Sequence, residues 1–192
     1  MLLNQLEIIT LLTTYCPDIS AEEGELFLSI CKYKKVKSKT HLLKAGRTDK
    51  KVILILKGAA RAYCISEGGQ ELNNYIRQEG KLVGDARVFG NDSQILDVES
   101  IGETHYLEFD IMLLEELGFE NRGLMKFYLS FLKEIAITLS HRVNTFVTMN
   151  AEERYEDLVK WNPSYLKSTY DKHLASFLGI KPLTLYRVKN KK

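Results

Sequence analysis

The hydrophobic pattern divides the chain into three stretches with different periodicities. Apolar residues in 2–32 recur at helical spacing. From 33 to about 109, short apolar runs are separated by glycine-bearing turns, which is typical of strands in a roll, barrel or sandwich. From 110 onward the spacing is helical again. The chain is therefore expected to be an α+β protein, with about eight short strands between two helical stretches.

Glycines punctuate the strand-like stretch. Gly58 is interpreted as a turn between two apolar runs, and Gly68 with Gly69 predicts a hairpin. The connections are too short to hold helices, which excludes a sheet of alternating strands and helices. The apolar runs are 52–56, 60–63, 72–76, 81–83, 95–101 and 105–109.

Two capping boxes mark helix starts. The Ser20 hydroxyl can accept a hydrogen bond from the Glu23 amide while the Glu23 side chain bonds back. Asn150 and Glu153 repeat the pattern. A new helix is therefore expected over 151–161, and Asn150 is a candidate hinge.

The stretch 120–149 contains no proline and predicts one long helix. At about 1.5 Å per residue it would be roughly 45 Å long, more than a domain of this size can cover. A heptad-like seam favours a parallel homodimer through 121–149, whereas periodicity alone also fits an ordinary buried helix. The seam, apolar or aromatic except for Arg142, consists of Met125, Tyr128, Leu132, Ile135, Leu139, Arg142, Phe146 and Met149.

The segment 171–190 meets the steric needs of a helix-turn-helix. Ala175 is small where two helices cross, Gly179 tolerates a left-handed turn, and Pro182 suits the first turn of the second helix. The packing residues are Leu174, Leu178, Ile180, Leu185 and Val188. A helical hairpin from an unrelated core is the alternative interpretation.

Charge distribution supports contact between this end of the chain and double-stranded DNA. The 192-residue chain has a formal net charge of only +2, but 181–192 carries five basic side chains and no acidic one. The basic residues are Lys181, Arg187, Lys189, Lys191 and Lys192.

Little in the sequence points to catalysis, metal binding or a membrane. Adjacent carboxylates such as Glu152–Glu153 point apart on a helix, and the four histidines have no metal-ligand spacing. The three cysteines are far apart, as is typical of thiols in a reducing cytoplasm. No apolar stretch approaches the roughly 20 residues that span a bilayer. We therefore expect a cytoplasmic protein that is not an enzyme.

Several short sequence segments resemble, in their order and spacing, segments of the Crp/Fnr transcription regulators. They are Leu42–Gly46, Val52–Gly58, Arg61–Tyr63, Gly69–Glu71, Gly80–Asp85 and Ala151–Tyr155. The resemblance implies an N-terminal antiparallel β-roll of the double-stranded jelly-roll type, a long dimerisation helix and a C-terminal helix-turn-helix. It divides the chain into 1–118, 119–149 and 150–192, and implies a homodimeric, sequence-specific regulator with RNA polymerase as a further candidate partner. A cyclic-nucleotide-type sensor acting through protein partners, with a decayed DNA-binding end, is the alternative function.

The resemblance also places an effector pocket in the roll, but with departures from the members that bind cyclic AMP. Gly84–Asp85 stands for their Gly-Glu pair, and Gln94–Ile95 for their phosphate-binding arginine and its neighbour. A phosphate without a cation loses its strongest hydrogen bonds. The pocket is therefore expected either to bind a small molecule other than cyclic AMP or to be unoccupied, and no cofactor is assigned. The implied lining is Arg61, Gly84, Asp85, Arg87, Gln94, Ile95, Leu96, Leu139 and Ser140.

The second helix of the helix-turn-helix is expected to enter the major groove. Arg187 could read a guanine or grip a phosphate, and both roles stay open. The sequence ends at Lys192, directly after this helix, which predicts a subtype without the family's β-wing. The expected DNA contacts are Lys181, Pro182, Thr184, Arg187, Lys189, Asn190, Lys191 and Lys192.

Overall fold

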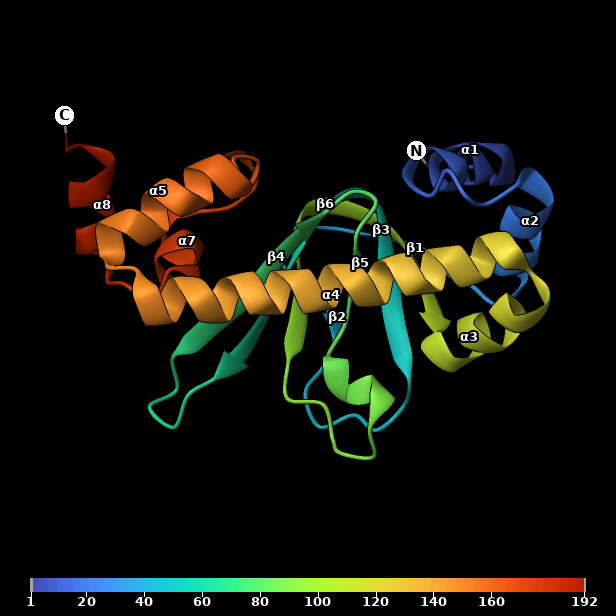
Figure 1. Ribbon diagram of the computed structural model, residues 1–192, viewed down its shortest axis with the longest axis horizontal. Coiled ribbons are helices and arrows are strands. Elements are labelled where there is room, and N and C mark those ends of the chain that lie inside the picture. Colours follow the sequence, from blue (N-terminus) through green and yellow to red (C-terminus); the bar gives the residue numbers. More distant parts are fainter. Residues whose placement is uncertain (1, 192) are drawn as a thin grey trace.

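The computed structural model describes residues 2–191, so the expected contact of Lys192 lies outside the described residues. Figure 1 shows an elongated molecule with a β-sheet at its centre and helices at both ends. The long helix α4 (Arg122–Thr148) runs along the sheet and joins the two helical ends. The α+β class expected from the sequence is confirmed.

All pairings in the six-stranded sheet are antiparallel, in the order β1-β6-β3-β4, with β2 on β6 and β5 on β3. Both faces of β3 are buried: Val52, Leu54 and Leu56 pack toward the helices, and Ile53 and Ile55 toward the inside of the roll. The strands are β1 (Lys32–Val36), β2 (His41–Leu43), β3 (Lys51–Ile65), β4 (Glu71–Gln78), β5 (Leu82–Val83) and β6 (Asp97–Asp110).

The expectation of about eight short strands is wrong, because the described residues form six strands and two of these are long. The runs 52–56 and 60–63 belong to β3, and 95–101 and 105–109 fall largely within β6. Gly58 is not a turn between strands, because β3 continues through it for 15 residues. Gly58 has a φ of 91°, and the β3–β6 register shifts on both sides of Lys57. A Cβ at Gly58 would lie 2.4 Å from the backbone oxygen of Glu103. This glycine therefore forms a bulge that bends the long strand against its neighbour.

The N-terminal helices close one side of the roll. They are α1 (Gln5–Tyr15) and α2 (Ala21–Ser29), and the predicted capping box of Ser20 and Glu23 is confirmed. Glu23 Oε1 also accepts a hydrogen bond from the Gly123 amide at 2.7 Å. The same carboxylate therefore caps α2 and fixes the start of α4, which follows α3 (Ile111–Glu120).

Four helices form the C-terminal end: α5 (Ala151–Trp161), α6 (Tyr165–Ser168), α7 (Asp171–Phe177) and α8 (Pro182–Lys189). The predicted capping box at Asn150 is confirmed. The core of this end also contains Ile76 of β4. Ser176 Oγ of α7 accepts a hydrogen bond from the Asn73 amide at 2.9 Å and donates one to the Glu71 oxygen at 3.0 Å. The C-terminal helices are therefore docked directly on the edge of the sheet.

The predicted helix-turn-helix geometry is present in α7 and α8. Ala175 is buried, Gly179 has a φ of 65°, and Pro182 occupies the first turn of α8. A Cβ at Gly179 would lie 2.8 Å from the Phe146 ring, so this glycine also allows the turn to approach α4.

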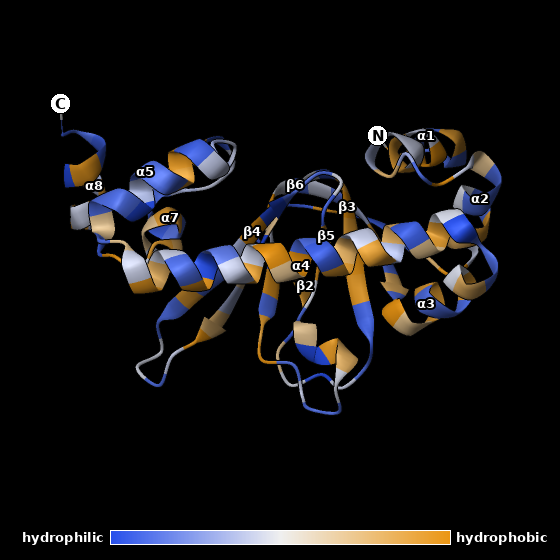
Figure 2. Cartoon of the chain, in the orientation of Figure 1, coloured by the Kyte–Doolittle hydropathy of each residue, from blue (hydrophilic) through white to orange (hydrophobic). Residues whose placement is uncertain are grey.

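The predicted seam of α4 is mostly occupied within the chain. Tyr128 is buried in the roll core, Leu132 packs against that core, and Arg142 lies over the Phe177 ring. Two seam residues, Leu139 and Phe146, are exposed, and a neighbouring apolar face of α4 is open to solvent beside them. The exposed large side chains of that face are Leu129, Ile137, Val143 and Val147. In Figure 2, hydrophobic residues accordingly recur along the whole of α4.

Candidate functional site

A cavity of about 190 Å³ lies between the roll, α4 and the C-terminal helices. Strands β4 and β5 form one wall, α4 another, and α5 to α7 close the end near the hinge. Five residues of the predicted effector pocket line it: Gly84, Asp85, Ile95, Leu96 and Leu139. The cavity thus extends beyond the predicted pocket, toward the helix-turn-helix.

Asp85 organises the roll side of this cavity. Its Oδ1 accepts a hydrogen bond from the Arg87 amide at 3.0 Å. Its Oδ2 accepts from the amides of Ile95 at 2.6 Å and Leu96 at 3.1 Å. Because both oxygens are engaged by the backbone, Asp85 shapes the wall and is a poor direct partner for a ligand.

Gly84 is required by the close packing beside it. A Cβ at this position would lie 2.8 Å from Val52 Cγ1. The Tyr75 hydroxyl donates to the Gly84 oxygen and accepts from its amide. Burial raises the pKa of Tyr75 to about 12, so this hydroxyl stays protonated and holds the turn in place.

Arg61 does not line the cavity, contrary to expectation. Its guanidinium is buried and forms ion pairs with Glu71 at 2.6 Å and Glu99 at 3.0 Å. Nη1 also donates to Asn73 Oδ1 at 3.2 Å. With its charge met by two carboxylates, Arg61 serves the architecture of the sheet.

Three other expected pocket residues also lie outside the cavity lining. The buried Gln94 donates from Nε2 to the Asp49 oxygen at 2.6 Å. Arg87 is exposed and donates to the Ser93 oxygen at 3.3 Å, and Ser140 is exposed on α4. Gln94 therefore fastens the loop that precedes β6, and none of the three is placed to hold a ligand here.

The cavity instead contains three arginines that were not predicted as site residues: Arg77, Arg142 and Arg154. Within residues 2–191, none of their guanidinium groups forms an ion pair with a carboxylate. Arg142 was the single charged position in the predicted seam of α4. An isolated charge in an apolar stripe is a signal of a buried polar function, and it could have identified this residue from the sequence.

Arg142 is enclosed by aromatic rings. Its guanidinium carbon lies 4.4 Å from the Phe177 ring centre and 4.8 Å from that of Phe146. Nη2 donates to the Asn73 backbone oxygen at 3.3 Å, while Nη1 is buried without a hydrogen-bond partner. Burial lowers the pKa of Arg142 to about 10, so the group is still charged at neutral pH.

His173 of α7 lies at the junction between the helix-turn-helix and the sheet. Burial, then the charges of Arg61 and Lys172, lower the pKa of His173 to about 4, although Glu71 and Glu99 act in the opposite direction. The imidazole is therefore neutral at physiological pH. Its protonation at low pH would place another positive charge beside Arg61.

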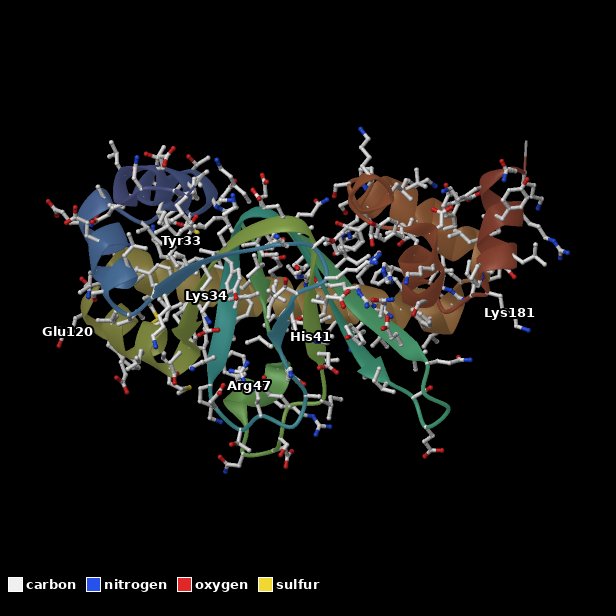
Figure 3. All side chains as sticks on the ribbon, turned by 180° about the vertical axis from the view of Figure 1, so that it is seen from behind. Tyr33, Lys34, His41, Arg47, Glu120 and Lys181 are labelled. Atoms are coloured by element: carbon white, nitrogen blue, oxygen red, sulfur yellow. The ribbon has the colours of Figure 1, made fainter. Side chains whose placement is uncertain are left out.

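The candidate DNA-binding surface is the solvent side of α8. Lys181, Pro182, Arg187 and Asn190 are exposed, whereas Thr184 is half-buried. Figure 3 shows Lys181 at the outer end of the C-terminal helices, pointing away from the sheet. Lys181 is therefore accessible to a partner on the outside of the molecule.

Two expected phosphate-contacting lysines have partners within the chain. Lys189 Nζ lies 2.8 Å from Asp171 Oδ1, and Lys191 Nζ lies 2.5 Å from Glu152 Oε2. The side chains are 33% and 61% exposed in the first pair and 65% and 40% in the second. Exposed pairs of this kind contribute about 0–1 kcal/mol, so a phosphate could replace the carboxylate.

Neither a metal centre nor a membrane span is found between residues 2 and 191. No group of three or more His, Cys, Asp or Glu side chains there is arranged to hold a metal ion. No helix in that range is both long and apolar enough to cross a bilayer. The three cysteines are unpaired, and burial raises the pKa of the Cys16 thiol to about 12.

Comparisons with known proteins establish the fold. No protein-family model matches the sequence, and no curated protein is similar to it. A CooA variant from Carboxydothermus hydrogenoformans has a TM-score of 0.69 and 17% identity, with 85% of this chain and 77% of CooA covered. FixK2 from Bradyrhizobium japonicum has a TM-score of 0.68 and 12% identity, with 83% of each chain covered.

A third similar structure is the c-di-GMP-responsive global regulator CLP from Xanthomonas campestris. It has a TM-score of 0.68 and 16% identity, with 88% of this chain and 89% of CLP covered. The chain therefore has the fold of these proteins: a β-roll of the cyclic-nucleotide-binding type, a long connecting helix and a C-terminal helix-turn-helix.

Proposed function

We propose that this protein is a homodimeric, sequence-specific DNA-binding transcription regulator of the Crp/Fnr type. Its effector domain is 1–118, its dimerisation helix 119–149 and its DNA-binding domain 150–192. The observation that carries the proposal is a continuous connection: α4 forms a wall of the cavity and leads, through Asn150, into the helix-turn-helix. The likeness to the regulator CLP supports it.

The partner of the exposed face of α4 is a second copy of this chain. On that face Leu129, Ala136 and Val143 follow one another at intervals of seven residues. Ser140 and Val147 on the same face are also seven residues apart, as in a heptad repeat. The small Ala136 and Ser140 let two helices approach closely. A parallel pair would present two recognition helices to half-sites about 34 Å apart.

The dimer can be tested by charge substitution on each face of α4. Val143→Lys changes a side chain that is 62% exposed, so it is expected to give folded monomers in sedimentation. Leu132→Lys is the matched control, because Leu132 packs against the roll core and the change should destabilise the fold. A wild-type protein that sediments as a monomer at micromolar concentration would contradict the dimer.

The proposed DNA contacts follow from the exposed side of α8. Arg187 is the candidate for bidentate contact with guanine, worth about 1–3 kcal/mol of discrimination. Thr184 and Asn190 lie beside it, and Lys181, Lys189 and Lys191 are proposed to contact phosphates. Pro182 fixes the start of the helix at the groove.

An unbiased selection of bound DNA sequences tests this surface. Arg187→Ala should relax preference at one base pair of each half-site, whereas Lys181→Ala should weaken all sequences alike and lower the salt slope by about one unit. Uniform weakening by Arg187→Ala would reassign that residue to a phosphate. The proposed docking of α8 would be wrong if neither change affected binding.

One observation favours the second candidate, a sensor that acts through protein partners. Leu183 and Tyr186 on the same side of α8 are 60% and 65% exposed, a composition that also suits a protein interface. The DNA selection separates the two functions, because a protein-binding surface would enrich no sequence.

The effector is proposed to be a small molecule other than cyclic AMP. The roll has Gln94 at the position of the phosphate-binding arginine of the members that bind cyclic AMP, and the Gln94 side chain donates a hydrogen bond to the Asp49 backbone oxygen. Calorimetry with cyclic AMP is expected to show no low-micromolar binding, and such binding would contradict this assignment.

A further inference from the structure

The strongest unexplained feature outside the helix-turn-helix is the charge balance of the cavity. Its three arginines face two lining carboxylates, and both carboxylates are already engaged. Asp85 accepts backbone amides, and Asp157 lies 2.7 Å from His141 Nε2. The lining therefore carries three guanidinium groups against two carboxylates, and within residues 2–191 none of the three guanidinium groups forms an ion pair with either carboxylate.

Each arginine is also held in place by neutral groups. Arg77 Nη1 donates to the Tyr165 hydroxyl at 3.1 Å, and Arg154 donates to the backbone oxygens of Leu178 at 3.0 Å and Met149 at 2.9 Å. These bonds position the guanidinium groups without cancelling their charge. The guanidinium groups of Arg142 and Arg154 both lie against the ring of Phe146.

Arg142 is the least satisfied of the three. A guanidinium has five N–H donors, and Nη1 of Arg142 has no partner although it is buried. A buried polar group without a partner is rare and costs free energy, and an unpaired buried charge costs more. Such an arrangement is explained if the missing partner is a bound anion.

The rest of the cavity suits an apolar ligand body. Leu82, Leu96, Phe131, Ile135, Leu158 and Trp161 contribute to its lining. Its volume of about 190 Å³ is smaller than the roughly 300–1,000 Å³ of pockets for drug-sized ligands. A molecule with one ring or a short chain fits this space.

We propose that the cavity binds a small organic anion whose carboxylate or phosphate group is held by Arg142 of α4, with Arg77 and Arg154 beside it. The assignment rests on the proposed function only in calling this ligand the effector. Because β4, β5, α4 and α5 to α7 all contribute to the walls, an occupied cavity would favour one placement of the C-terminal helices over another.

The test compares benzoate with its neutral isostere benzamide in a protein-observed NMR titration of the full chain. A fragment of this size is expected to bind with a Kd on the order of 1 mM. Because benzamide cannot form a charge-assisted bond to the guanidinium of Arg142, it should bind about 10- to 100-fold more weakly than benzoate. Phenyl phosphate in the same titration tells a phosphate ligand from a carboxylate ligand.

Arg142→Met is the decisive variant, because it keeps an unbranched apolar stem about as far as the position of Nε and removes the charged guanidinium group. Benzoate should bind this variant no better than benzamide, while the amide spectrum stays folded. If the variant does not fold, Arg154→Gln replaces it and should reduce the preference for benzoate at least several-fold.

The proposal is wrong if neither compound binds, if both bind the wild type equally, or if Arg142→Met keeps the full preference for benzoate. The titration uses no DNA. If the titration fails while the DNA selection succeeds, the anion site is wrong and the proposed function stands. If the DNA selection fails while the titration succeeds, the proposed function is wrong and the anion site stands.

Discussion

Two arginines contact Asn73 through different atoms and have opposite surroundings. Arg61 of β3 donates to the Asn73 side chain and forms ion pairs with Glu71 and Glu99. Arg142 of α4 donates to the Asn73 backbone oxygen and lies against aromatic rings. The comparison teaches that an arginine withdrawn from solvent supports the fold when carboxylates meet its charge, and that the half-buried Arg142, which no carboxylate meets, is a candidate binding group.

The largest expected effect is the loss of stability when Arg61, whose charge is met by carboxylates, is replaced. Arg61→Met should lower the free energy of unfolding by about 2–4 kcal/mol, because it leaves Glu99 nearly buried without its cation. Urea denaturation measures the loss. Arg47→Met is the control, since Arg47 pairs with the exposed Asp49 and should cost under about 1 kcal/mol. Equal losses in Arg61→Met and Arg47→Met would show that the ion pairs of Arg61 contribute no more to stability than an exposed ion pair.

A pH effect sharpens the same comparison through His173. The folded pKa of about 4 lies below the ordinary value of 6.5, so the unfolded chain binds the proton first. The stability contributed by neutral His173 is present above pH 6.5 and is lost as the pH falls toward 4. Between pH 7 and pH 5 this amounts to about 1–2 kcal/mol.

His173→Gln supplies the control for this pH effect. Urea denaturation of the wild type and of His173→Gln at the two pH values gives the contribution of His173 to the free energy of unfolding. The other titratable groups are present in both proteins, so their contributions cancel in the difference. An identical pH dependence would show that His173 is not responsible. In Arg61→Met the pKa of His173 should rise, since one of the charges that lower it is gone.

Asn73→Ala is expected to affect the hydrogen bond to Arg61 and to leave the one to Arg142 intact, because the two arginines use different atoms of Asn73. It removes the Oδ1 acceptor used by Arg61 and leaves the backbone oxygen used by Arg142. We expect a loss of about 1 kcal/mol in the free energy of unfolding, the typical value for one buried hydrogen bond. Loss of the preference for benzoate in this variant would show instead that the two arginines act together.

The smallest effect on the free energy of unfolding is expected when Arg142, which no carboxylate meets, is replaced. Arg142→Met replaces a charge that no carboxylate meets by a shorter apolar chain, so the free energy of unfolding should change by no more than about 0.5 kcal/mol or should increase. Thermal and urea denaturation give this value. A loss above about 2 kcal/mol would place Arg142 with Arg61 among the residues that support the fold.

Local signals in the sequence predicted the elements well. The capping boxes at Ser20 and Asn150 and the turn at Gly179 are confirmed because each depends on a few adjacent residues. Gly58 was misread because a bulge and a turn both use a left-handed glycine. Only the pairing of β3 with β6 distinguishes them.

The site was harder to predict because its residues meet only in three dimensions. Periodicity found the apolar seam of α4, but it does not say whether the seam faces the same chain or another. Arg142 stands out as the one charge in its apolar stripe, but the sequence does not show whether a carboxylate meets Arg61 or Arg142, since their environments are set by β4, β6 and α7. The prediction reached Gly84 and Asp85, which shape the wall, and missed the arginines across the cavity.

The position of Ile76 has a consequence for how such proteins can be recombined. This residue belongs to β4, yet its fully buried side chain completes the core formed by Leu158, Leu174 and Leu185. A graft of 150–192 onto an unrelated sensor would leave that core open on one side. The helix-turn-helix is therefore not an interchangeable module, and a chimera must carry the edge strand together with the helices.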